Sequence, residues 1–256
     1  MGKTYARSFL SSRFIEAKDL YILCKRKSDA EIFTEIPAEN IQERPGDFIG
    51  MADIIILAVK PQDFNSLALM ISPFVASDQL ILSIMAGIKL ESIMTKLNVR
   101  KAARSMPNLP AQIGMGMTVF TASNELDRKE LFIIQNLINT TGKSIYVENE
   151  TLVDGATAIS GSGPAYVYYF MLSMIQAAEK MGFTLSQAEL LVNQTFMGAV
   201  HLHNQSDYTC QEWINKVASK GGTTEAALKV LNGGKVSPNI ESALAAAFER
   251  AKELGN

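Results

Sequence analysis

Residues 52–61 read "ADIIILAVKP", and this stretch decides the fold class. Its centre is an unbroken run of apolar side chains, most of them β-branched, which is typical of a strand buried on both faces of a sheet. Lys60 and Pro61 follow directly, and a proline at that point favours the start of a helix. The stretch therefore predicts a buried strand that leads into a helix.

The same unit recurs along the first part of the chain. Strand-like runs occur at 20–23 ("LYIL"), 54–59 ("IIILAV") and 80–84 ("LILSI"), with a weaker one at 101–104 and two later ones at 115–120 and 144–147. Helix-type spacing is found at 28–36, 62–74, 90–97 and 125–141. Apolar strands that alternate with helices indicate a parallel sheet covered on both faces. We therefore expect an α/β domain here.

The character of the chain changes near residues 147–152. Beyond them no convincing strand remains, and helices are predicted at 165–181, 185–203, 209–218, 223–231 and 238–254. "SGSG" at 160–163 is expected to break the chain before the first long helix, with Pro164 at a favoured starting position. We predict two domains, 1–149 and 150–256. The helical one has more apolar surface than a small bundle hides, which favours burial against another subunit.

The opening "MGKTYARSFL" (1–10) fits two phosphate-binding motifs. Gly2-Lys3-Thr4 could end a P-loop, or Gly2 could be the last glycine of a dinucleotide fingerprint, and both motifs place phosphate at a helix N-terminus. A P-loop enzyme needs an aspartate at the end of a later strand, but Asp53 precedes its strand. A dinucleotide fold instead predicts a second strand about 20 residues on, and the run at 20–23 supplies it. The dinucleotide reading is favoured.

The predicted carboxyl ends of the strands carry unusual residues. They are the basic cluster "KRKS" at 25–28 after Cys24, "AVKP" at 58–61, "MAGI" at 85–88 and "SMPNLP" at 105–110. Ligands of open parallel sheets bind beyond these ends. A basic cluster after the second strand suits the 2′-phosphate of NADP, whereas an acidic residue would suit a free ribose hydroxyl. The alternative is a solvated basic turn.

Composition excludes several classes of protein. The 256 residues carry a net charge of −2, which argues against nucleic-acid and membrane-surface binding. Cys24 and Cys210 lie far apart and fit a reducing compartment. We find no signal peptide and no apolar run of spanning length, so we expect a cytoplasmic protein. No metal site is expected, because His201 and His203 are two residues apart on one predicted helix and do not face each other.

At this point the chain resembles the pyrroline-5-carboxylate reductase family. The matching motifs, in order, are "ADIIILAVKP" (52–61), "RSMPNLP" (104–110), "TAISGSGPAYVYYF" (157–170), "NQTFMGAV" (193–200) and "GGTTEAAL" (221–228). The resemblance implies a Rossmann-type N-terminal domain and an all-α C-terminal dimerisation domain. It implies NADPH-dependent reduction of 1-pyrroline-5-carboxylate to L-proline, with NADH as an open alternative. It also implies homodimers that assemble through the C-terminal helices, with decamers as a further assembly.

The segment "SKGGTT" (219–224) leads into a predicted helix, so its backbone N–H groups lie at the positive end of a helix dipole. Such an end can hold a carboxylate. The resemblance implies that the backbone of Gly222 and Thr223 and the hydroxyl of Ser219 bind the substrate carboxylate. It further implies that Thr224 is the catalytic residue and presents its hydroxyl to the ring nitrogen. The alternative is that Thr223 or Thr224 is only an N-cap.

The resemblance also implies a set of cofactor-binding residues. Arg26, supported by Lys25, would bind the 2′-phosphate, and Gly2 would lie beside the pyrophosphate. The residues expected to line the dinucleotide are Ala58, Val59, Lys60 and Pro61, and those at its nicotinamide end are Ile84, Met85 and Ala86. Asn108 would shape the floor of the pocket.

The sequence departs from the family in three respects. It starts inside the glycine fingerprint, so we expect the first strand to be missing from the middle of the sheet and two strand edges to lack a partner. Leu172 and Gln176 stand where carboxylates are frequent, and Lys220 stands where proline is usual. Two alternatives therefore stay open. One is a catalytically impaired fragment that only oligomerises, and the other is a related imine or ketone reductase.

Overall fold

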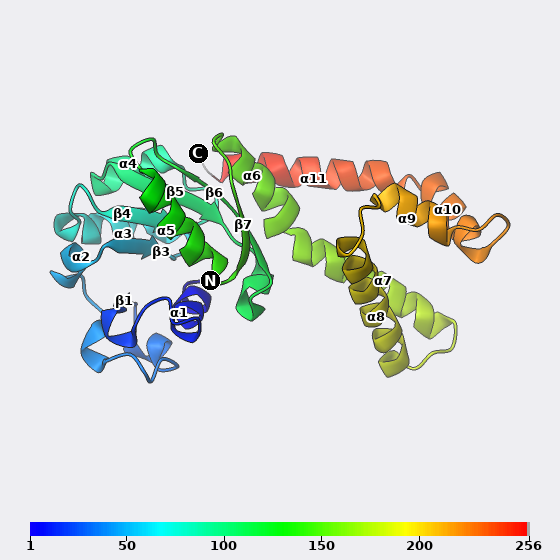
Figure 1. The fold of residues 1–256 in the computed structure, drawn as a ribbon, viewed down its shortest axis with the longest axis horizontal. Helices are drawn as coiled ribbons and strands as arrows, with labels where there is room; N and C mark the ends of the chain where they lie inside the picture. The colour runs from blue at the N-terminus through cyan, green and yellow to red at the C-terminus, as the bar shows by residue number, and fades with distance from the viewer. Residues whose placement is uncertain (255–256) are drawn as a thin grey trace. The chain divides into compact units, whose positions relative to one another are not determined.

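The computed structural model describes residues 1–254, and these form two compact units (Figure 1). The first unit consists of Met1–Pro164 and the chain from Ala246 onward, and the second consists of Ala165–Ala245. Helices α7 (Gly163–Lys180) and α11 (Val236–Glu253) each contribute residues to both units.

The main sheet of the first unit has the order β3-β4-β5-β6-β7. Its strands are β3 (Ile54–Leu57), β4 (Leu80–Ser83), β5 (Lys101–Met106), β6 (Gly116–Ala122) and β7 (Gly142–Tyr146). All neighbours pair in parallel except β5 and β6, which are antiparallel. The predicted parallel sheet thus contains one antiparallel pair, which the sequence pattern did not predict. The connection between them holds only the short helix η6 (Leu109–Ile113), and a parallel crossover needs a dozen or more residues.

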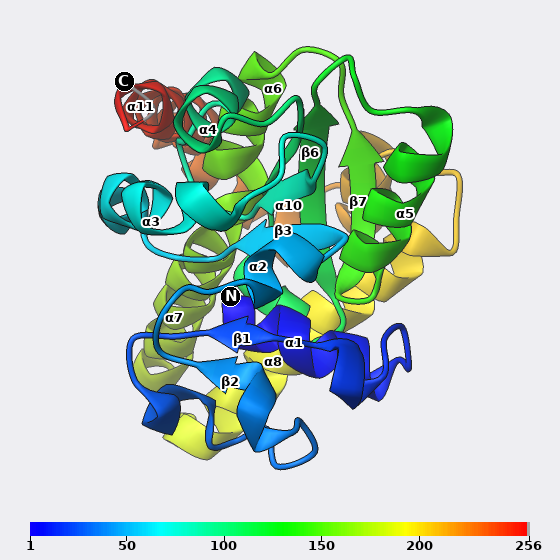
Figure 2. The same ribbon diagram turned by 90° about the vertical axis from the view of Figure 1, so that its left-hand side faces the viewer.

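A second, two-stranded parallel sheet pairs β1 (Ile22–Leu23) with β2 (Ile41–Gln42) (Figure 2). Among the described residues β1 pairs only with β2, and β3 pairs only with β4. The expectation that two strand edges would lack a partner is therefore confirmed.

The segment between β1 and β2 corrects one prediction. We expected a helix at 28–36, but the chain forms only the short helix η2 (Lys27–Ala30), followed by turns and then by η3 (Ala38–Asn40). Pro37 disfavours helical backbone at the residue before it. The apolar side chains of Phe33 and Ile36 are buried in a small cluster with Ala30 instead.

Helices cover both faces of the main sheet, as the alternation of the sequence predicts. On one face lie α1 (Gly2–Ser11) and α5 (Arg128–Asn139), and on the other lie α2 (Phe48–Met51), α3 (Phe64–Ile71) and α4 (Leu90–Leu97). Successive residues of β4 supply the two cores, because Leu82 packs with the first group and Ile81 with the second. Each of these side chains is fully buried and contributes about 1.5–3 kcal/mol.

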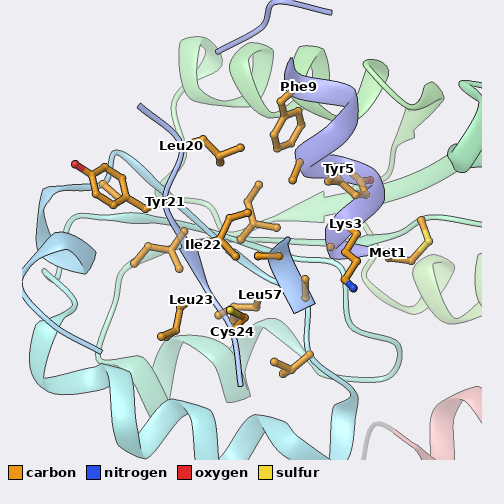
Figure 3. A pocket seen from close by; sticks show the side chains of 18 of the residues that line it. Met1, Lys3, Tyr5, Phe9, Leu20, Tyr21, Ile22, Leu23, Cys24 and Leu57 are labelled. Atoms are coloured by element: carbon orange, nitrogen blue, oxygen red, sulfur yellow. The ribbon is translucent and has the colours of Figure 1, made fainter. Parts of the chain in front are cut away.

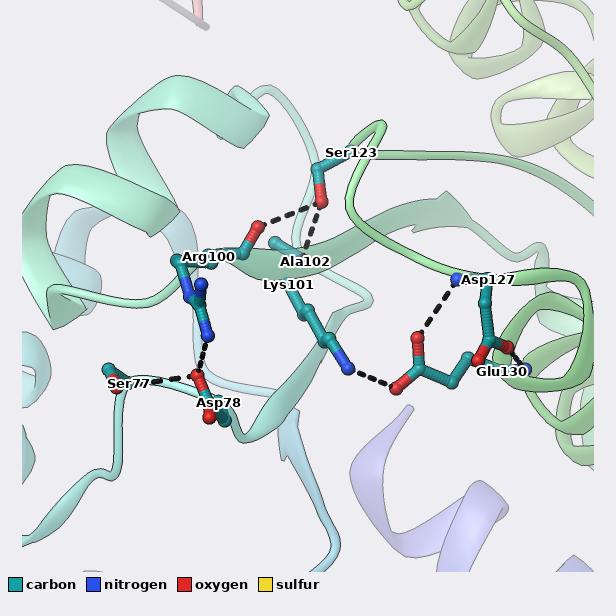
Figure 4. Close-up of polar contacts among 8 residues, drawn as sticks. All are labelled: Ser77, Asp78, Arg100, Lys101, Ala102, Ser123, Asp127 and Glu130. Atoms are coloured by element: carbon teal, nitrogen blue, oxygen red, sulfur yellow. Dashed lines mark hydrogen bonds and ion pairs between the residues drawn. The ribbon is translucent and has the colours of Figure 1, made fainter.

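The amino end of β5 is anchored to its surroundings by polar contacts (Figure 4). Lys101 Nζ lies 2.6 Å from the carboxylate of Glu130, and this contact raises the pKa of Lys101. Glu130 also forms the capping box of α5 with Asp127. Ser123 Oγ accepts a hydrogen bond from the Ala102 N–H and donates one to the Arg100 carbonyl. These contacts fix β5 relative to α5 and to the end of β6.

Arg104, in the middle of β5, is the most deeply buried charged side chain among the described residues. Its side chain is 1% exposed and binds two carboxylates, Asp154 and Glu150, the latter at 3.0 Å. Both belong to the start of α6 (Thr151–Ala156), since Glu150 directly precedes its first residue. The Glu150 Oε1 atom also accepts a hydrogen bond from the Leu90 N–H at the start of α4. One guanidinium thus connects the central sheet with α6 and, through Glu150, with α4.

The chain between α6 and α7 differs from the expected break at 160–163. It continues as a π-helical turn over Thr157–Gly161, and α7 begins at Gly163. A Cβ atom at Gly161 would lie 2.6 Å from Cε of Met106, so the glycine permits close approach to the end of β5. The helix α6 was not predicted because it is a single short segment.

The second unit is helical throughout, as predicted. Besides α7 and α11 it contains α8 (Leu185–Asn204), α9 (Cys210–Val217) and α10 (Thr223–Gly233). Among its described apolar residues only Ala188 and Val192 are buried. Large side chains on its helices are exposed, and on α8 these include Leu190, Met197 and Val200. The single chain therefore provides this unit with almost no core of its own.

We expect Arg104→Met to lower the free energy of unfolding by about 3–5 kcal/mol, because two carboxylates at a buried site would lose their counter-charge. Urea denaturation of the purified chain measures the change. Arg100→Met is the matched control, since Arg100 pairs with Asp78 on the surface and such a pair contributes about 0–1 kcal/mol. Equal effects of the two substitutions would contradict the role given to Arg104.

Candidate functional site

The carboxyl ends of β3, β4 and β5 lie at one edge of the main sheet, because these three strands are parallel neighbours. The predicted cofactor residues directly after them are Ala58 and Val59, Ile84 to Ala86, and Asn108. The structure therefore brings these residues to a common edge, where open α/β sheets bind ligands.

Gly2 lies against the end of β3. A Cβ atom at this position would lie 2.9 Å from Cβ of Ala58, so only a glycine lets the first turn of α1 approach so closely. No side chain caps the N-terminus of α1 in the described structure. Its first N–H groups therefore have no intrahelical or side-chain acceptor, and such a helix end favours an anion. Gly2, Ala58 and Val59 also lie along one cavity of about 640 Å³.

The three residues after β4 differ in what they could offer a ligand. The side chains of Ile84 and Met85 are buried in the two cores on opposite faces of the sheet. The Ile84 N–H donates a hydrogen bond to the carbonyl of Leu57. Of the three residues, Ala86 is the one whose side chain is only half-buried. Gly87 follows with a φ of +78°, a conformation that favours glycine. A flat ligand here would contact mainly the backbone and the methyl group of Ala86.

The basic cluster after β1 is exposed, and its two predicted ligands both have acidic partners. Lys25 Nζ lies 3.2 Å from Asp63 Oδ2, and Arg26 Nη2 lies 3.5 Å from Asp29 Oδ1. Both basic side chains are more than three-quarters exposed, and ion pairs this exposed contribute about 0–1 kcal/mol. An incoming phosphate would therefore displace these carboxylates at small cost.

The neighbouring Cys24 is an ordinary thiol. Burial raises its pKa, and the nearby carboxylates of Asp29 and Glu43 add to the effect. Lys60 and Pro61 precede α3, where Pro61 opens a short 3₁₀ turn that also contains Asp63. Lys60 is exposed and Pro61 is half-buried.

Both polar atoms of the Asn108 side chain form hydrogen bonds within the protein. Its Nδ2 donates to the carbonyl of Ser160 at 3.1 Å, and its Oδ1 accepts from the N–H of Met117 at 2.8 Å. The side-chain amide thus connects the chain after β5 to β6 and to the π-helical turn. It shapes this region through those contacts.

The predicted substrate loop precedes α10 in the second unit. Gly221 has a φ of +75°, and a Cβ atom at Gly222 would lie only 2.6 Å from Oγ of Ser219. The Gly221 N–H donates to the carboxylate of Glu225, and the Gly222 N–H donates to the carbonyl of Ser219. Ser219, Gly222, Thr223 and Thr224 are therefore held together by the turn. Glu225, which sequence reasoning missed, stabilises it, and its position in the first helical turn was the available signal.

Capping distinguishes α10 from the two preceding helices. Thr184 and Thr209 form complete capping boxes at the starts of α8 and α9. At α10 the N-cap is Gly222, and no side-chain hydrogen bond caps the helix among the described residues. Thr223 and Thr224 are the first two helical residues, so the alternative that one of them is an N-cap is wrong. The positive end of α10 remains open to an anion.

The described part of the chain shows neither a metal-binding cluster nor a membrane-spanning helix. Residues 1–254 contain no group of three or more histidine, cysteine, aspartate or glutamate side chains arranged to hold a metal ion. They also contain no helix with the length and apolar character that a membrane crossing requires.

Comparison with known families gives two matches. Residues 150–254 match the model for pyrroline-5-carboxylate reductase dimerisation. Residues 1–87 match the model for NADP oxidoreductase, coenzyme F420-dependent. Together they cover the helical part of the chain and the segment that contains β1 to β4.

Individual proteins agree with these matches. The pyrroline-5-carboxylate reductases of Staphylococcus aureus and Staphylococcus epidermidis are each 32% identical to the chain, over 100% of it and 95% of their own length. The structure resembles a pyrroline-5-carboxylate reductase from Coxiella burnetii (TM-score 0.90, 26% identity). It also resembles the Plasmodium falciparum pyrroline carboxylate reductase, solved with NADP bound (TM-score 0.89, 28% identity). Both matches cover 100% of this chain and 95% of the other. With this identity and coverage, the chain belongs to the pyrroline-5-carboxylate reductase family.

Proposed function

We propose that this protein reduces 1-pyrroline-5-carboxylate to L-proline with NADPH. The observation that carries the proposal is the uncapped start of α10, where Thr223 and Thr224 follow two glycines and the dipole favours a carboxylate. Family membership supports the reaction, and the NADP found in the Plasmodium falciparum relative supports the cofactor.

The substrate is an anionic cyclic imine, and each of its polar groups has a proposed partner. The Thr223 N–H and the Ser219 hydroxyl bind the carboxylate, and the Gly222 N–H exchanges its hydrogen bond to the Ser219 carbonyl for one to the carboxylate. The Thr224 hydroxyl contacts the ring nitrogen and holds the imine in one orientation. The imine reacts in its N-protonated form: the hydride adds to the imine carbon, the C=N π electrons become the lone pair of the nitrogen, and the nitrogen keeps its proton as a secondary amine. These residues contribute orientation and electrostatic stabilisation.

The cofactor residues fit a phosphorylated dinucleotide. The close approach at Gly2 and the uncapped end of α1 suit a pyrophosphate, and Arg26 with Lys25 suits the 2′-phosphate. Ala58, Val59, Lys60 and Pro61 line the dinucleotide, and Ile84, Met85 and Ala86 contact the nicotinamide end mainly through backbone. Asn108 supports the floor of this pocket. When bound, NADPH supplies the hydride.

We further infer a division of labour between residues 1–149, which bind the cofactor, and 150–256, which bind substrate and dimerise. The dimerisation family match from residue 150 supports this division. The exposed apolar face of α8 supports a homodimer, from which a decamer could be built. We place the enzyme in the cytoplasm, where its two free cysteines stay reduced.

The reaction is tested by following NADPH oxidation with 1-pyrroline-5-carboxylate. We expect Thr224→Ala to lower kcat about 100-fold, because the hydroxyl that orients and hydrogen-bonds the imine nitrogen is lost. Thr224→Ser keeps the hydroxyl and should retain most activity. Thr209→Ala is the control, since it removes an ordinary cap, with an expected loss of about 1 kcal/mol of stability and unchanged kcat. Preference for another imine or a ketone over 1-pyrroline-5-carboxylate would overturn the substrate assignment.

The basic cluster is tested by cofactor preference. We expect Arg26→Ala to raise the KM for NADPH about 10- to 100-fold and to leave the KM for NADH unchanged, because a charge-assisted hydrogen bond to the 2′-phosphate contributes about 1.5–3 kcal/mol. Steady-state kinetics with both cofactors measures the difference. Arg128→Ala, a change on α5, is the control for a general loss of positive charge. An equal rise for both cofactors would contradict a 2′-phosphate contact.

The homodimer is tested by light scattering after size-exclusion chromatography. We expect the native chain to have at least twice the monomer mass, and Met197→Glu to shift it toward the monomer, because a carboxylate would enter an apolar interface. Phe132→Glu alters a comparably exposed apolar side chain on α5 and should leave the mass unchanged. A native chain that stays monomeric at high concentration would exclude the homodimer.

A further inference from the structure

The loop that joins β4 to α4 (residues 84–89, the nicotinamide loop) carries the three residues that we assign to the nicotinamide end of the cofactor. Its start is held by the sheet. The Ile84 N–H donates to the carbonyl of Leu57 at 3.0 Å, and Leu57 lies in the wall of the cavity beside α1 (Figure 3). The Met85 N–H donates to Oγ of Ser83 at 3.3 Å. The first two residues of the loop are therefore fixed relative to β3 and β4.

The end of the nicotinamide loop has a different anchor. Gly87 turns the chain with a φ of +78°, and Lys89, the N-cap of α4, makes no side-chain capping hydrogen bond. The N–H of Leu90, the first residue of α4, donates instead to Oε1 of Glu150 at 2.9 Å, across 60 positions of sequence. Glu150 therefore fixes the end of the loop that the contacts with β3 and β4 do not reach.

The same oxygen of Glu150 makes a second contact. Oε1 also accepts a hydrogen bond from Nη1 of Arg104 at 3.0 Å. Arg104 is 1% exposed, and its other terminal nitrogen binds the buried carboxylate of Asp154. The Glu150 side chain is 30% exposed and extends from this buried cation to the start of α4. One carboxylate oxygen thus connects the middle of β5 with the end of the nicotinamide loop.

Stability alone is a poor account of this cluster. Apolar residues of similar volume often stabilise a protein as well as a buried ion pair does, because the charges lose their hydration. The Nε of Arg104 is also buried without a hydrogen-bond partner in the described structure, and an unpaired buried N–H lowers stability further. Directional contacts, in contrast, hold two elements in one relative position. The cluster is therefore better explained by the position that it gives to α4 and to the loop before it.

We propose that Glu150 is a positioning residue for hydride transfer, and that it acts by holding the start of α4 so that the nicotinamide loop keeps one conformation. The inference rests on the proposed function, because that function places residues 84–86 against the nicotinamide. Glu150 acts through the Leu90 N–H and does not itself contact the reacting atoms. Hydride transfer depends on this precision, since a misplacement of about 1 Å can cost about 100-fold in rate.

The test separates the reach of the Glu150 side chain from its charge. Glu150→Gln keeps an oxygen that can accept from both Leu90 and Arg104 and loses only the charge, whereas Glu150→Ala loses both contacts. We expect Glu150→Ala to lower kcat about 10-fold and to change the KM for the imine less than about twofold. Glu150→Gln should retain most of the native kcat. Steady-state oxidation of NADPH with 1-pyrroline-5-carboxylate measures both constants.

Glu130→Ala is the matched control. Glu130 is 22% exposed, binds the basic side chain of Lys101 and accepts from the backbone N–H of Asp127 at the start of α5, so its contacts are of the same kinds (Figure 4). None of them involves the nicotinamide loop. We expect Glu130→Ala to lower the thermal midpoint and to leave kcat unchanged.

Two further measurements do not depend on turnover. Hydrogen exchange of the amides in residues 84–90, followed by mass spectrometry, should be about fivefold faster in Glu150→Ala than in the native chain or in Glu150→Gln. Calorimetry compares NADPH with 2′-phospho-ADP-ribose, which lacks the nicotinamide. We expect Glu150→Ala to weaken binding of NADPH and to leave binding of the truncated cofactor unchanged.

Two outcomes would overturn the proposal. If Glu150→Gln loses as much kcat as Glu150→Ala, the charge matters and not the hydrogen bond to α4. If Glu150→Ala lowers only the thermal midpoint, with native kcat and native exchange in residues 84–90, the cluster serves stability alone. A native chain that does not reduce 1-pyrroline-5-carboxylate would overturn the proposed reaction. Faster exchange and weaker NADPH binding in Glu150→Ala would still support the link from Glu150 to the loop in that case.

Discussion

The buried guanidinium of Arg104 is the constraint on which the rest of the first unit depends. A charge with 1% of its side chain exposed is tolerated only with close partners, and here the partners come from the start of α6. Since Glu150 also holds the first N–H of α4, the segment that follows β4 is tied to the same charge. The position of Met85 and Ala86 at the sheet edge and the direction in which the chain leaves the sheet are thus set by one cluster. An apolar contact is non-directional and would let α6 slide along β5, whereas the directional contacts of Arg104 with Glu150 and Asp154 hold the two elements in one register.

The two halves of the proposed chemistry use the same physical device. At α1 and at α10 a helix begins next to a glycine, without a side-chain cap, and leaves N–H groups for an anion. The helices α8 and α9 lie in the same chain and are fully capped by Thr184 and Thr209. The helices α2, α3, α4 and α6 also start without a side-chain cap from the N-cap residue, so it is the adjacent glycine together with the uncapped end that we associate with binding. At α1 the anion is a pyrophosphate in our proposal, and at α10 it is the substrate carboxylate.

The periodicity of the sequence predicted most of the elements, because the residue pattern of an apolar strand or an amphipathic helix lies within one short stretch of sequence. It failed where longer-range contacts decide. Residues 28–36 had helical spacing, but Pro37 and the burial of Phe33 prevented a helix. The antiparallel direction of β6 followed from the length of its connection. The pairing of Lys25 with Asp63 joins residues 38 positions apart, whose proximity no local pattern reveals, whereas Arg26 pairs with Asp29 only three positions on. The motif "GGTT" located the start of α10 correctly, but only coordinates could show that it lacks a cap.

The π-helical turn at Thr157–Gly161 has a consequence for how the chain can vary in length. Elsewhere in a helix, loss of one residue turns everything downstream by about 100° and carries side chains to a different face. A π turn already holds one residue more than an α turn, so a deletion within it can relax to regular α-helix while the following residues keep their direction. We therefore expect this turn, between the sheet and α7, to tolerate the deletion of one residue better than the regular helices do.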